Sequence, residues 1–303
     1  MIIFDKVNKF ILHEVDLHVP EGITLGIIGA SGAGKTTFLK LISGLLKPQS
    51  GTVSTLRKNP VSNSKQIASR VSVLFADIPV FDDSLSILDN LDELRLIYGI
   101  KKTEFENQLE KLSKLLDFSD ILHSKLKNLS LGQKRRVELG LTFLRDADLY
   151  LFDEPCLGLD QNGKAAFYKL VQEKKRAGKT ILFSSHSIED IATVSDRVLV
   201  LNKGNVRFYG SKEELYKRLA PVEKINLELD GNFPDISDLE VEHYDFENGK
   251  MTVLFNSNHV SSKEVLERIC TTARIKSVSV KKAGLAESLA ESIKSFDSGR
   301  KEA

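Results

Sequence analysis

The sequence predicts an α/β fold built on a mostly parallel sheet, followed by a small α+β C-terminal domain. Three observations lead to this prediction. Apolar, strand-like runs alternate with helix-like segments along most of the chain. One of these runs leads into a glycine-rich stretch, Gly29 to Thr37, which precedes a helical pattern. Beyond Pro221 the pattern changes to short strands, which indicates a separate unit.

The composition limits the class of protein. The chain has 303 residues, enough for one large domain and a small one. Charged residues make up 28% and the net charge is +1, so the composition does not suggest a nucleic-acid partner. No apolar stretch is long enough to span a bilayer, and we expect no secretory signal. Cys156 and Cys270 are expected to be reduced cytosolic thiols, and no Cys/His spacing indicates a metal site.

The first part of the chain is expected to mix strands with a helical insert. Strands are predicted at 2–7, 10–12, 15–19, 23–28 and 70–75, with a turn at 20–22 and a helix that ends near Leu46. From about 84 to 127 the apolar spacing is helical. Ser86 with Asp89, and Thr103 with Glu106, are interpreted as capping boxes of two helices in this insert.

The helix that follows Leu131 carries three consecutive basic residues, Lys134, Arg135 and Arg136. We interpret them as a solvated helix face, or as phosphate contacts made by the N-terminal end of the helix; contact with nucleic acid is the alternative. With this helix included, the helical insert covers about 84–145.

The next part of the chain alternates strands and helices. Strands are expected at 149–152 and 180–185, a crossover helix at 164–177, a short helix capped by Ser187 with Asp190, a hairpin of 197–201 with 206–209, and a short helix at 212–219. Such alternation predicts a parallel sheet, in which ligands bind at the carboxyl ends of the strands. Gly34, Asp153, Glu154 and His186 all follow strand ends, so one site could collect them.

The C-terminal unit is expected to contain strands at 224–229, 240–245, 251–255 and 275–280, with helices at 262–273 and 285–293. The predicted domains are therefore 1–219, which holds the helical insert, and 220–295. Residues 296–303 are polar and are predicted to be a disordered tail.

The glycine-rich stretch has the residue types of a phosphate-binding P-loop. Its glycines leave backbone N–H groups free to surround an anion, and the following helix N-terminus adds partial positive charge. Lys35 is placed to reach the outer phosphates, and the Thr36 hydroxyl to ligate Mg²⁺. The stretch therefore predicts nucleotide binding without specifying the reaction.

Two adjacent acids, Asp153 and Glu154, end the strand at 149–152. Such a pair is costly unless a cation offsets the repulsion, and beside a P-loop we expect Asp153 to hold Mg²⁺. Glu154 is then placed to orient and polarise an attacking water. An acidic strand end that faces water is the alternative.

A second motif, LSLGQ at Leu129 to Gln133, precedes the basic helix. Ser130 is suited to cap that helix, and its hydroxyl, the glycine backbone and the helix N-terminus together also suit an anion. With these motifs in order, the chain resembles the nucleotide-binding subunits of ABC transporters over about 2–219. Their signature reads LSGGQ, and the order P-loop, helical insert, signature, acidic pair, Leu159-Asp160 and His186 is the same.

The resemblance implies a P-loop NTPase of ABC type with an antiparallel β subdomain, which sandwiches ATP with Mg²⁺ between two such domains, head to tail. It implies that Glu154 is the general base, that His186 contacts the γ-phosphate, that Lys35 assists catalysis, and that Thr36 and Asp153 hold the metal. The implied nucleotide contacts are Phe10, Gly29, Ala30, Ser31, Gly32, Ala33, Gly34, Lys35, Thr36, Thr37, Ser130, Gly132, Gln133 and Asp160.

Two positions bear on how far the resemblance holds. Phe10 occupies the place of an aromatic that stacks on adenine, with a core phenylalanine as the alternative. The family has a glutamine near the end of the strand at 70–75, where this chain has Ala76 followed by Asp77. Alanine neither ligates a metal nor donates a hydrogen bond. We therefore expect hydrolysis that is slower or differently coupled, or substitution by Asp77 or water.

The resemblance implies an ATPase subunit, most like those of type-two ABC exporters, on the cytoplasmic face of the membrane. Their closing segment, SLEDVF, is similar to the stretch around Leu285 to Ile293. Expected partners are a polytopic membrane subunit on a separate chain, docked through the helical insert and the loop 76–83, and a second ATP-binding subunit in a homodimer. The alternatives are a soluble ABC ATPase that acts on nucleic acid or ribosomes, and a catalytically weak regulator.

Overall fold

The computed structural model describes residues 1–75, 77, 81–218, 222–230, 234, 236, 238–241 and 243–282, with the side chains of 216–218 left aside. The chain divides into two compact units, Met1–Lys212 and a second from Glu213 onward. The domain limits predicted at 219 and 295 and the tail at 296–303 fall on residues outside the described part and stay predictions. Across the described ranges, no helix has both the length and the apolar character that crossing a bilayer requires.

A six-stranded sheet organises the first unit, in the order β5-β6-β7-β3-β8-β9. Its strands are β3 (Thr24–Ile28), β5 (Val71–Leu74), β6 (Leu149–Phe152), β7 (Thr180–Ser185), β8 (Arg197–Asn202) and β9 (Asn205–Ser211). All neighbours pair in parallel except β8 and β9, which form a hairpin. The prediction of a mostly parallel sheet is confirmed, and the carboxyl ends of β3, β6 and β7 meet at one edge.

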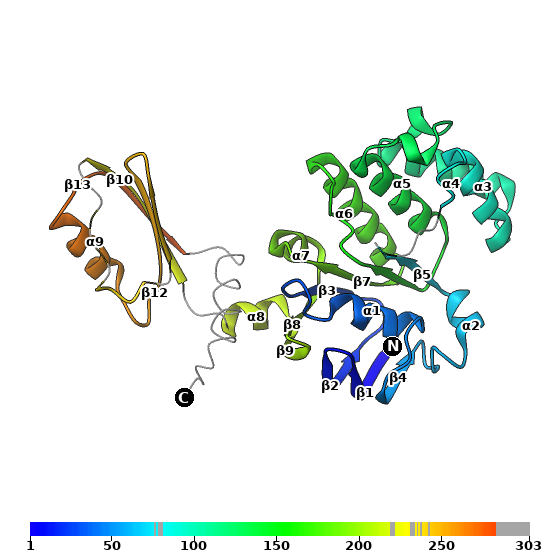
Figure 1. Ribbon diagram of the computed structural model, residues 1–303, viewed down its shortest axis with the longest axis horizontal. Helices are drawn as coiled ribbons and strands as arrows, with labels where there is room; N and C mark the ends of the chain where they lie inside the picture. Colours follow the sequence, from blue (N-terminus) through cyan, green and yellow to red (C-terminus); the bar gives the residue numbers. More distant parts are fainter. Residues whose placement is uncertain are drawn as a thin grey trace. The chain divides into compact units, whose positions relative to one another are not determined.

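The central strands are buried on both faces because different helices cover each face (Figure 1). On one face, Leu25, Leu151 and Leu182 belong to the cluster that includes α1 (Lys35–Ser43) and the antiparallel strands. On the other face, the Phe152 ring lies 5.1 Å from Phe143 of α5 (Leu131–Leu144) and 5.4 Å from Phe167 of α6 (Gln161–Arg176). Alternate side chains thus pack into two separate cores.

A three-stranded antiparallel sheet, in the order β2-β1-β4, lies on the α1 side. Its strands are β1 (Ile2–Lys9), β2 (Leu12–Val19) and β4 (Ser50–Thr55). The separate strand predicted at 10–12 is wrong because Phe10 and Ile11 form the turn between β1 and β2. Sequence reasoning also missed β4 and the short helix α2 (Ser64–Ala68), because both are short, mostly exposed and carry few apolar residues.

The helical insert contains α3 (Ile87–Tyr98), α4 (Lys102–Leu115), two 3₁₀ turns (Ser119–Ile121 and Leu126–Asn128) and then α5. The Ser86 hydroxyl accepts the Asp89 N–H, so the first predicted cap is present. The second is wrong: α4 begins at Lys102, before Thr103, and its N-cap Lys101 makes no side-chain hydrogen bond. The first turn of α4 is exposed, and the helix is stabilised by the buried face that begins at Phe105.

The predicted solvated face of α5 is wrong for two of its three basic residues. Arg135 and Arg136 are buried, exposed to only 6% and 9%. Arg136 donates to the Leu116 carbonyl at 2.8 Å and to Asp160 Oδ1 at 2.7 Å. Because a buried guanidinium needs such partners, this basic run belongs to the packing between α4, α5 and α6.

Helix α7 (Ile188–Val194) belongs to the first unit, and α8 (Lys212–Arg218) begins at the boundary between the two units. The second unit has a four-stranded antiparallel sheet in the order β11-β12-β10-β13. Its strands are β10 (Val222–Asp230), β11 (His243–Glu247), β12 (Lys250–Asn256) and β13 (Arg274–Lys282), and α9 is Ser262–Cys270. Ile225, Val253, Phe255 and Val265 belong to its core. The helix predicted at 285–293 lies outside the described residues.

Candidate nucleotide site

The P-loop, Gly29 to Thr37, connects β3 to α1, as predicted. Gly32 and Gly34 have φ of 77° and 104°, values that favour glycine. A Cβ on Gly29 would lie 2.3 Å from the Leu201 carbonyl oxygen, so β8 leaves room only for glycine there. The Lys35 ammonium donates to the carbonyls of Gly29 at 2.7 Å and Ala30 at 3.3 Å. The loop is therefore held in an anion-binding shape by its own chain.

Thr36 and Asp153 lie together although 117 positions separate them. The Thr36 hydroxyl donates to Asp153 Oδ2 at 2.6 Å. The pair places a hydroxyl and a carboxylate oxygen side by side at the N-terminus of α1, and oxygen atoms are the ligands that Mg²⁺ prefers. These two residues therefore fit the predicted metal, and the remaining ligands would come from substrate phosphates and water.

Sequence reasoning missed Ser184, which joins the two acids. Its hydroxyl donates to Asp153 Oδ1 at 2.6 Å and accepts the Glu154 N–H at 2.9 Å. The side chain is fully buried near the end of β7. The available signal was its place two residues before His186 in a strand whose neighbours are apolar. A buried hydroxyl there needs polar partners, and the neighbouring strand β6 supplies them.

Glu154 lies at the centre of the predicted catalytic residues. Its Oε2 lies 2.9 Å from His186 Nδ1 and accepts the His186 N–H at 3.3 Å, and its Oε1 lies 3.4 Å from the Lys35 ammonium. Because an ionised carboxylate only accepts, the hydrogen in this pair belongs to Nδ1. Glu154 has a φ of 50°, a left-handed conformation that is uncommon for its residue type and that aims the side chain at this cluster.

Phe10 is 65% exposed at the turn between β1 and β2, so a core role for its ring is wrong. The Lys9 ammonium lies 4.4 Å from the centre of the ring, over its face. The same turn adjoins the P-loop, because a Cβ on Gly34 would lie 2.7 Å from Leu12 and 3.3 Å from Ile11. An exposed aromatic face close to the loop fits the predicted stack on adenine.

The signature residues occupy a different place. Ser130 caps α5, and its partner Gln133 completes a capping box. A Cβ on Gly132 would lie 2.9 Å from the Gly158 carbonyl oxygen, so the signature packs on the segment before Asp160. Asp160 caps α6 through the Gly163 N–H at 2.9 Å and pairs with Arg136. Within the residues that the structure describes, no hydrogen bond or ion pair joins these groups to the P-loop.

The region of the expected glutamine is described only in part. Ala76 lies outside the described residues. Asp77 forms an ion pair with Lys40 of α1, and this hydrogen bond holds the pKa of the Asp77 carboxyl below its usual value. Asp77 is therefore already engaged by a neighbour of the P-loop helix. Nearby, Cys156 is buried, and burial raises the pKa of its thiol to about 12, as expected of a packing residue.

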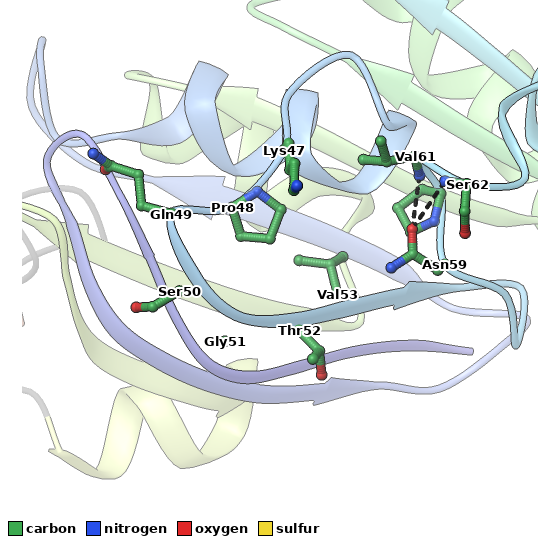
Figure 2. A pocket seen from close by; sticks show the side chains of 11 residues that line it. Lys47, Pro48, Gln49, Ser50, Gly51, Thr52, Val53, Asn59, Val61 and Ser62 are labelled. Atoms are coloured by element: carbon green, nitrogen blue, oxygen red, sulfur yellow. Dashed lines mark hydrogen bonds between the residues drawn. The ribbon is translucent and has the colours of Figure 1, made fainter.

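A pocket of about 400 Å³ lies apart from these residues, between β4 and the turn before α2 (Figure 2). Lys47, Gln49, Thr52 and Asn59 are among the residues that line it. The side-chain carbonyl oxygen of Asn59 accepts hydrogen bonds from the N–H groups of Val61 and Ser62, so this oxygen is already engaged within its own turn. None of the predicted site residues lines this pocket.

The sequence and the fold were compared with known proteins. Residues 12–157 match the family model described as ABC transporter. The ABC transporter ATP-binding protein NatA of Bacillus subtilis is 34% identical over 212 residues, 70% of this chain and 86% of that protein. The energy-coupling factor transporter ATP-binding protein EcfA3 of Oenococcus oeni is 34% identical over 227 residues, 72% of this chain and 78% of that protein.

The solved structures agree on the fold. A structure described as the ATP-binding subunit of an ABC transporter superposes with a TM-score of 0.67 at 26% identity, over 72% of this chain and 92% of that one. A dimeric ATP-binding cassette with ADP and phosphate has a TM-score of 0.63 at 22% identity, over 70% and 98% of the two chains. From its sequence and its fold, this chain belongs to the ABC transporter ATP-binding proteins and is an ATPase of that family.

Proposed function

We propose that this ATPase energises a membrane exporter as a homodimer that uses Mg²⁺ and docks on a polytopic membrane subunit carried by a separate chain. The proposal places it at the cytoplasmic face of the membrane. The observation that supports the catalytic part is the connected cluster of Lys35, Glu154 and His186, next to the Thr36–Asp153 pair. Three strand ends bring these residues together from distant parts of the sequence.

In this proposal each residue of the cluster has a defined task. Bound Mg²⁺ supplies charge neutralisation of the phosphates, held by Thr36 and Asp153. Lys35 and the N-terminal N–H groups of α1 bind the phosphate oxygens and stabilise the charge that develops on them. Glu154 orients the attacking water and accepts its proton, and His186 holds the Glu154 carboxylate through its Nδ1–H while its ring lies against the terminal phosphate. Positioning and charge stabilisation supply most of the rate.

The proposed homodimer rests on the exposed signature. Leu131 and Leu157 are 68% and 48% exposed, beside the exposed capping residue Ser130. The Leu131 side chain lies against Gly158, so the apolar surface is continuous with the segment that leads to Asp160. Exposed apolar groups next to an exposed helix N-terminus suit a partner that brings both apolar surface and phosphate. The P-loop side of a second copy carries both.

The proposed membrane partner and the direction of transport rest on other features. Leu96 and Ile97 at the end of α3 are 64% and 73% exposed, an apolar surface on the helical insert that suits docking. The separate α+β unit is the feature that favours an exporter. Sequence similarity itself is shared with proteins whose names specify import, such as the glucose import ATP-binding protein GlcV of Saccharolobus solfataricus, at 32% identity over 230 residues.

The catalytic part is tested with Glu154→Gln, which keeps the shape of the side chain and removes its basicity. We expect this variant to bind MgATP, to hydrolyse it at least about a hundredfold more slowly, and to accumulate as a dimer in size-exclusion chromatography. Glu189→Gln, at an exposed glutamate of α7, is the matched control and keeps wild-type turnover. Near-normal turnover in Glu154→Gln overturns the assignment of the base.

The transporter part is tested by affinity purification of the chain from detergent-solubilised membranes, with partners identified by mass spectrometry. We expect a stoichiometric polytopic membrane protein. Ribosomes or nucleic acid in its place would favour the soluble alternative. Transport by the purified pair, reconstituted with the ATPase outside the vesicles, then tests the direction: accumulation of substrate inside the vesicles supports an exporter, and loss of preloaded substrate supports an importer.

A further inference from the structure

The cluster around His186 includes a buried acid that the proposed mechanism does not use. Asp190, on α7, is only 2% exposed. Its Oδ1 accepts the Tyr168 hydroxyl at 2.6 Å and the Lys164 ammonium at 3.0 Å, both from α6. Its Oδ2 accepts the Ser185 hydroxyl at 3.0 Å. A buried carboxylate with three donors from two elements is held in one orientation.

Ser185 connects the fixed Asp190 carboxylate to the backbone around His186. Its hydroxyl donates to Asp190 and also accepts the Ser187 N–H at 3.0 Å. Ser185 is 2% exposed at the last position of β7, so it has no room to turn away. The residues before and after His186 are thus tied to one hydroxyl. The side chain of His186 is 65% exposed, so packing alone does not fix its ring.

The two serines at the end of β7 bind partners on opposite faces of the sheet. Ser184 binds the acidic pair through Asp153 Oδ1 and the Glu154 N–H. Ser185 points to the opposite face, toward Asp190, as alternate strand residues do. Ser184 binds the backbone N–H of Glu154, and Ser185 binds that of Ser187, next to His186. The two serines thus flank the backbone of the pair whose side chains lie 2.9 Å apart.

We propose that Asp190 is a positioning residue for His186. Through the Ser185 hydroxyl it fixes the backbone on both sides of the histidine. This keeps the imidazole Nδ1–H in its hydrogen bond to the Glu154 carboxylate. The geometric part stands without the catalytic proposal, and only its effect on turnover rests on the proposed function. Lys164 and Tyr168 also bind Asp190 to α6. The backbone around His186 is therefore positioned relative to that helix.

The direct test measures which ring nitrogen of His186 carries the hydrogen. The chain has six histidines, so ¹⁵N-histidine labelling gives few signals, and the His186 signal is the one lost in His186→Ala. We expect the Nδ1–H tautomer in the wild type, because Glu154 accepts that hydrogen. In Ser185→Ala and in Asp190→Asn the signal should shift toward the Nε2–H tautomer, which predominates in a free neutral histidine side chain.

Ser72→Ala is the matched control, because Ser72 is also a buried strand serine and donates a single hydrogen bond at 2.8 Å, to the Thr142 carbonyl. It should keep the wild-type His186 signal. Asp190→Asn removes a buried acceptor and can fail to fold, but Ser185→Ala leaves the Asp190 carboxylate paired with Lys164 and Tyr168. A wild-type tautomer in folded Ser185→Ala, or a change of tautomer in Ser72→Ala, overturns the proposal.

Kinetics separate this proposal from the proposed function. Ser185→Ala should lower kcat by about tenfold and leave the KM for ATP within about twofold, because no contact to the nucleotide is removed. Ser72→Ala should change neither. A changed tautomer with unchanged kcat keeps Asp190 as the positioning residue and contradicts the catalytic task assigned to His186. An unchanged tautomer contradicts the positioning whatever the kinetics show.

Discussion

The two groups of predicted site residues differ in how one chain holds them. Lys35, Thr36, Asp153, Glu154 and His186 are joined to one another by hydrogen bonds and ion pairs at the ends of parallel strands. Among the residues that the structure describes, the side chains of the signature residues make hydrogen bonds only at the start of their own helix, and they present a helix N-terminus to solvent. In the proposed function, one chain assembles the catalytic group and offers the signature group to a partner.

The largest effect is expected in the catalytic group. Lys35→Ala removes the ammonium that faces Glu154 and the P-loop carbonyls, and we expect kcat/KM for ATP to fall at least about a hundredfold. The measurement is steady-state MgATP turnover, with binding of a fluorescent nucleotide as a second readout. Lys47→Ala, at an exposed lysine beyond α1, is the control and stays active. Turnover within twofold of wild type in Lys35→Ala would remove this residue from the site.

The signature group should separate stability from activity. Ser130→Ala loses an N-cap, which costs about 1 kcal/mol of unfolding free energy. Ser86→Ala loses a comparable cap on α3 and serves as the control. We expect both to be destabilised in urea unfolding, and only Ser130→Ala to lose turnover, by about tenfold or more. Equal turnover in the two variants would leave Ser130 with a capping role alone.

The adenine contact should affect the KM and not the fold. Phe10→Ala removes a ring that is 65% exposed, so the unfolding temperature should stay the same. Loss of a stacked base should raise the KM for ATP about tenfold. Leu45→Ala, at a leucine 54% exposed, is the control for loss of exposed apolar surface. An unchanged KM in Phe10→Ala would exclude the stack.

The apolar surface beside the signature should strengthen association. Leu131→Ala removes a side chain that is 68% exposed and should weaken ATP-dependent dimerisation several-fold, measured by analytical ultracentrifugation in a Glu154→Gln background. Leu96→Ala, at a leucine 64% exposed on α3, tests the same loss elsewhere. If both variants dimerise equally well, the leucine of the signature contributes nothing to the interface.

The smallest effect on turnover is expected from chemical modification of the two cysteines. Burial raises the pKa of the Cys156 thiol to about 12, so this thiol stays protonated near neutral pH, while Cys270 is exposed. At pH 8, iodoacetamide should therefore modify one cysteine, and turnover should be unchanged. Peptide mapping by mass spectrometry gives the site. Rapid labelling of Cys156 would show that the segment after Glu154 opens.

The sequence predicts the catalytic group well because its residues come in short motifs with fixed spacing. The P-loop, the acidic pair and His186 could each be placed after a strand, and a parallel sheet brings such ends together. Sequence reasoning missed Ser184 and Ser185, because their partners, Asp153 and Asp190, can be identified only when the face of the sheet that each serine occupies is known. Periodicity in a strand buried on both faces does not give that information.

The errors elsewhere have a related cause. The basic run at Arg135 and Arg136 was interpreted from charge alone, yet carbonyl and carboxylate partners from other helices bury it. The capping box at Thr103 failed because α4 starts two residues earlier, with Lys101 at its N-cap position. The role of Phe10 was left open between an adenine stack and a core phenylalanine, and the strand predicted at 10–12 is a turn at Phe10 and Ile11. In each case tertiary contacts outweighed a local pattern.

The most direct test of the central claim mixes two inactive variants. If the P-loop of one chain works with the signature of another, a heterodimer of Lys35→Ala and Ser130→Ala contains one site with both groups intact. Equimolar mixing should then restore up to about a quarter of wild-type turnover, because about half of the dimers are mixed and each has one intact site. Mixing Lys35→Ala with Thr36→Ala is the control and should restore nothing. Recovery in the first mixture alone confirms a site shared between chains, and turnover that stays at the sum of the two variants contradicts it.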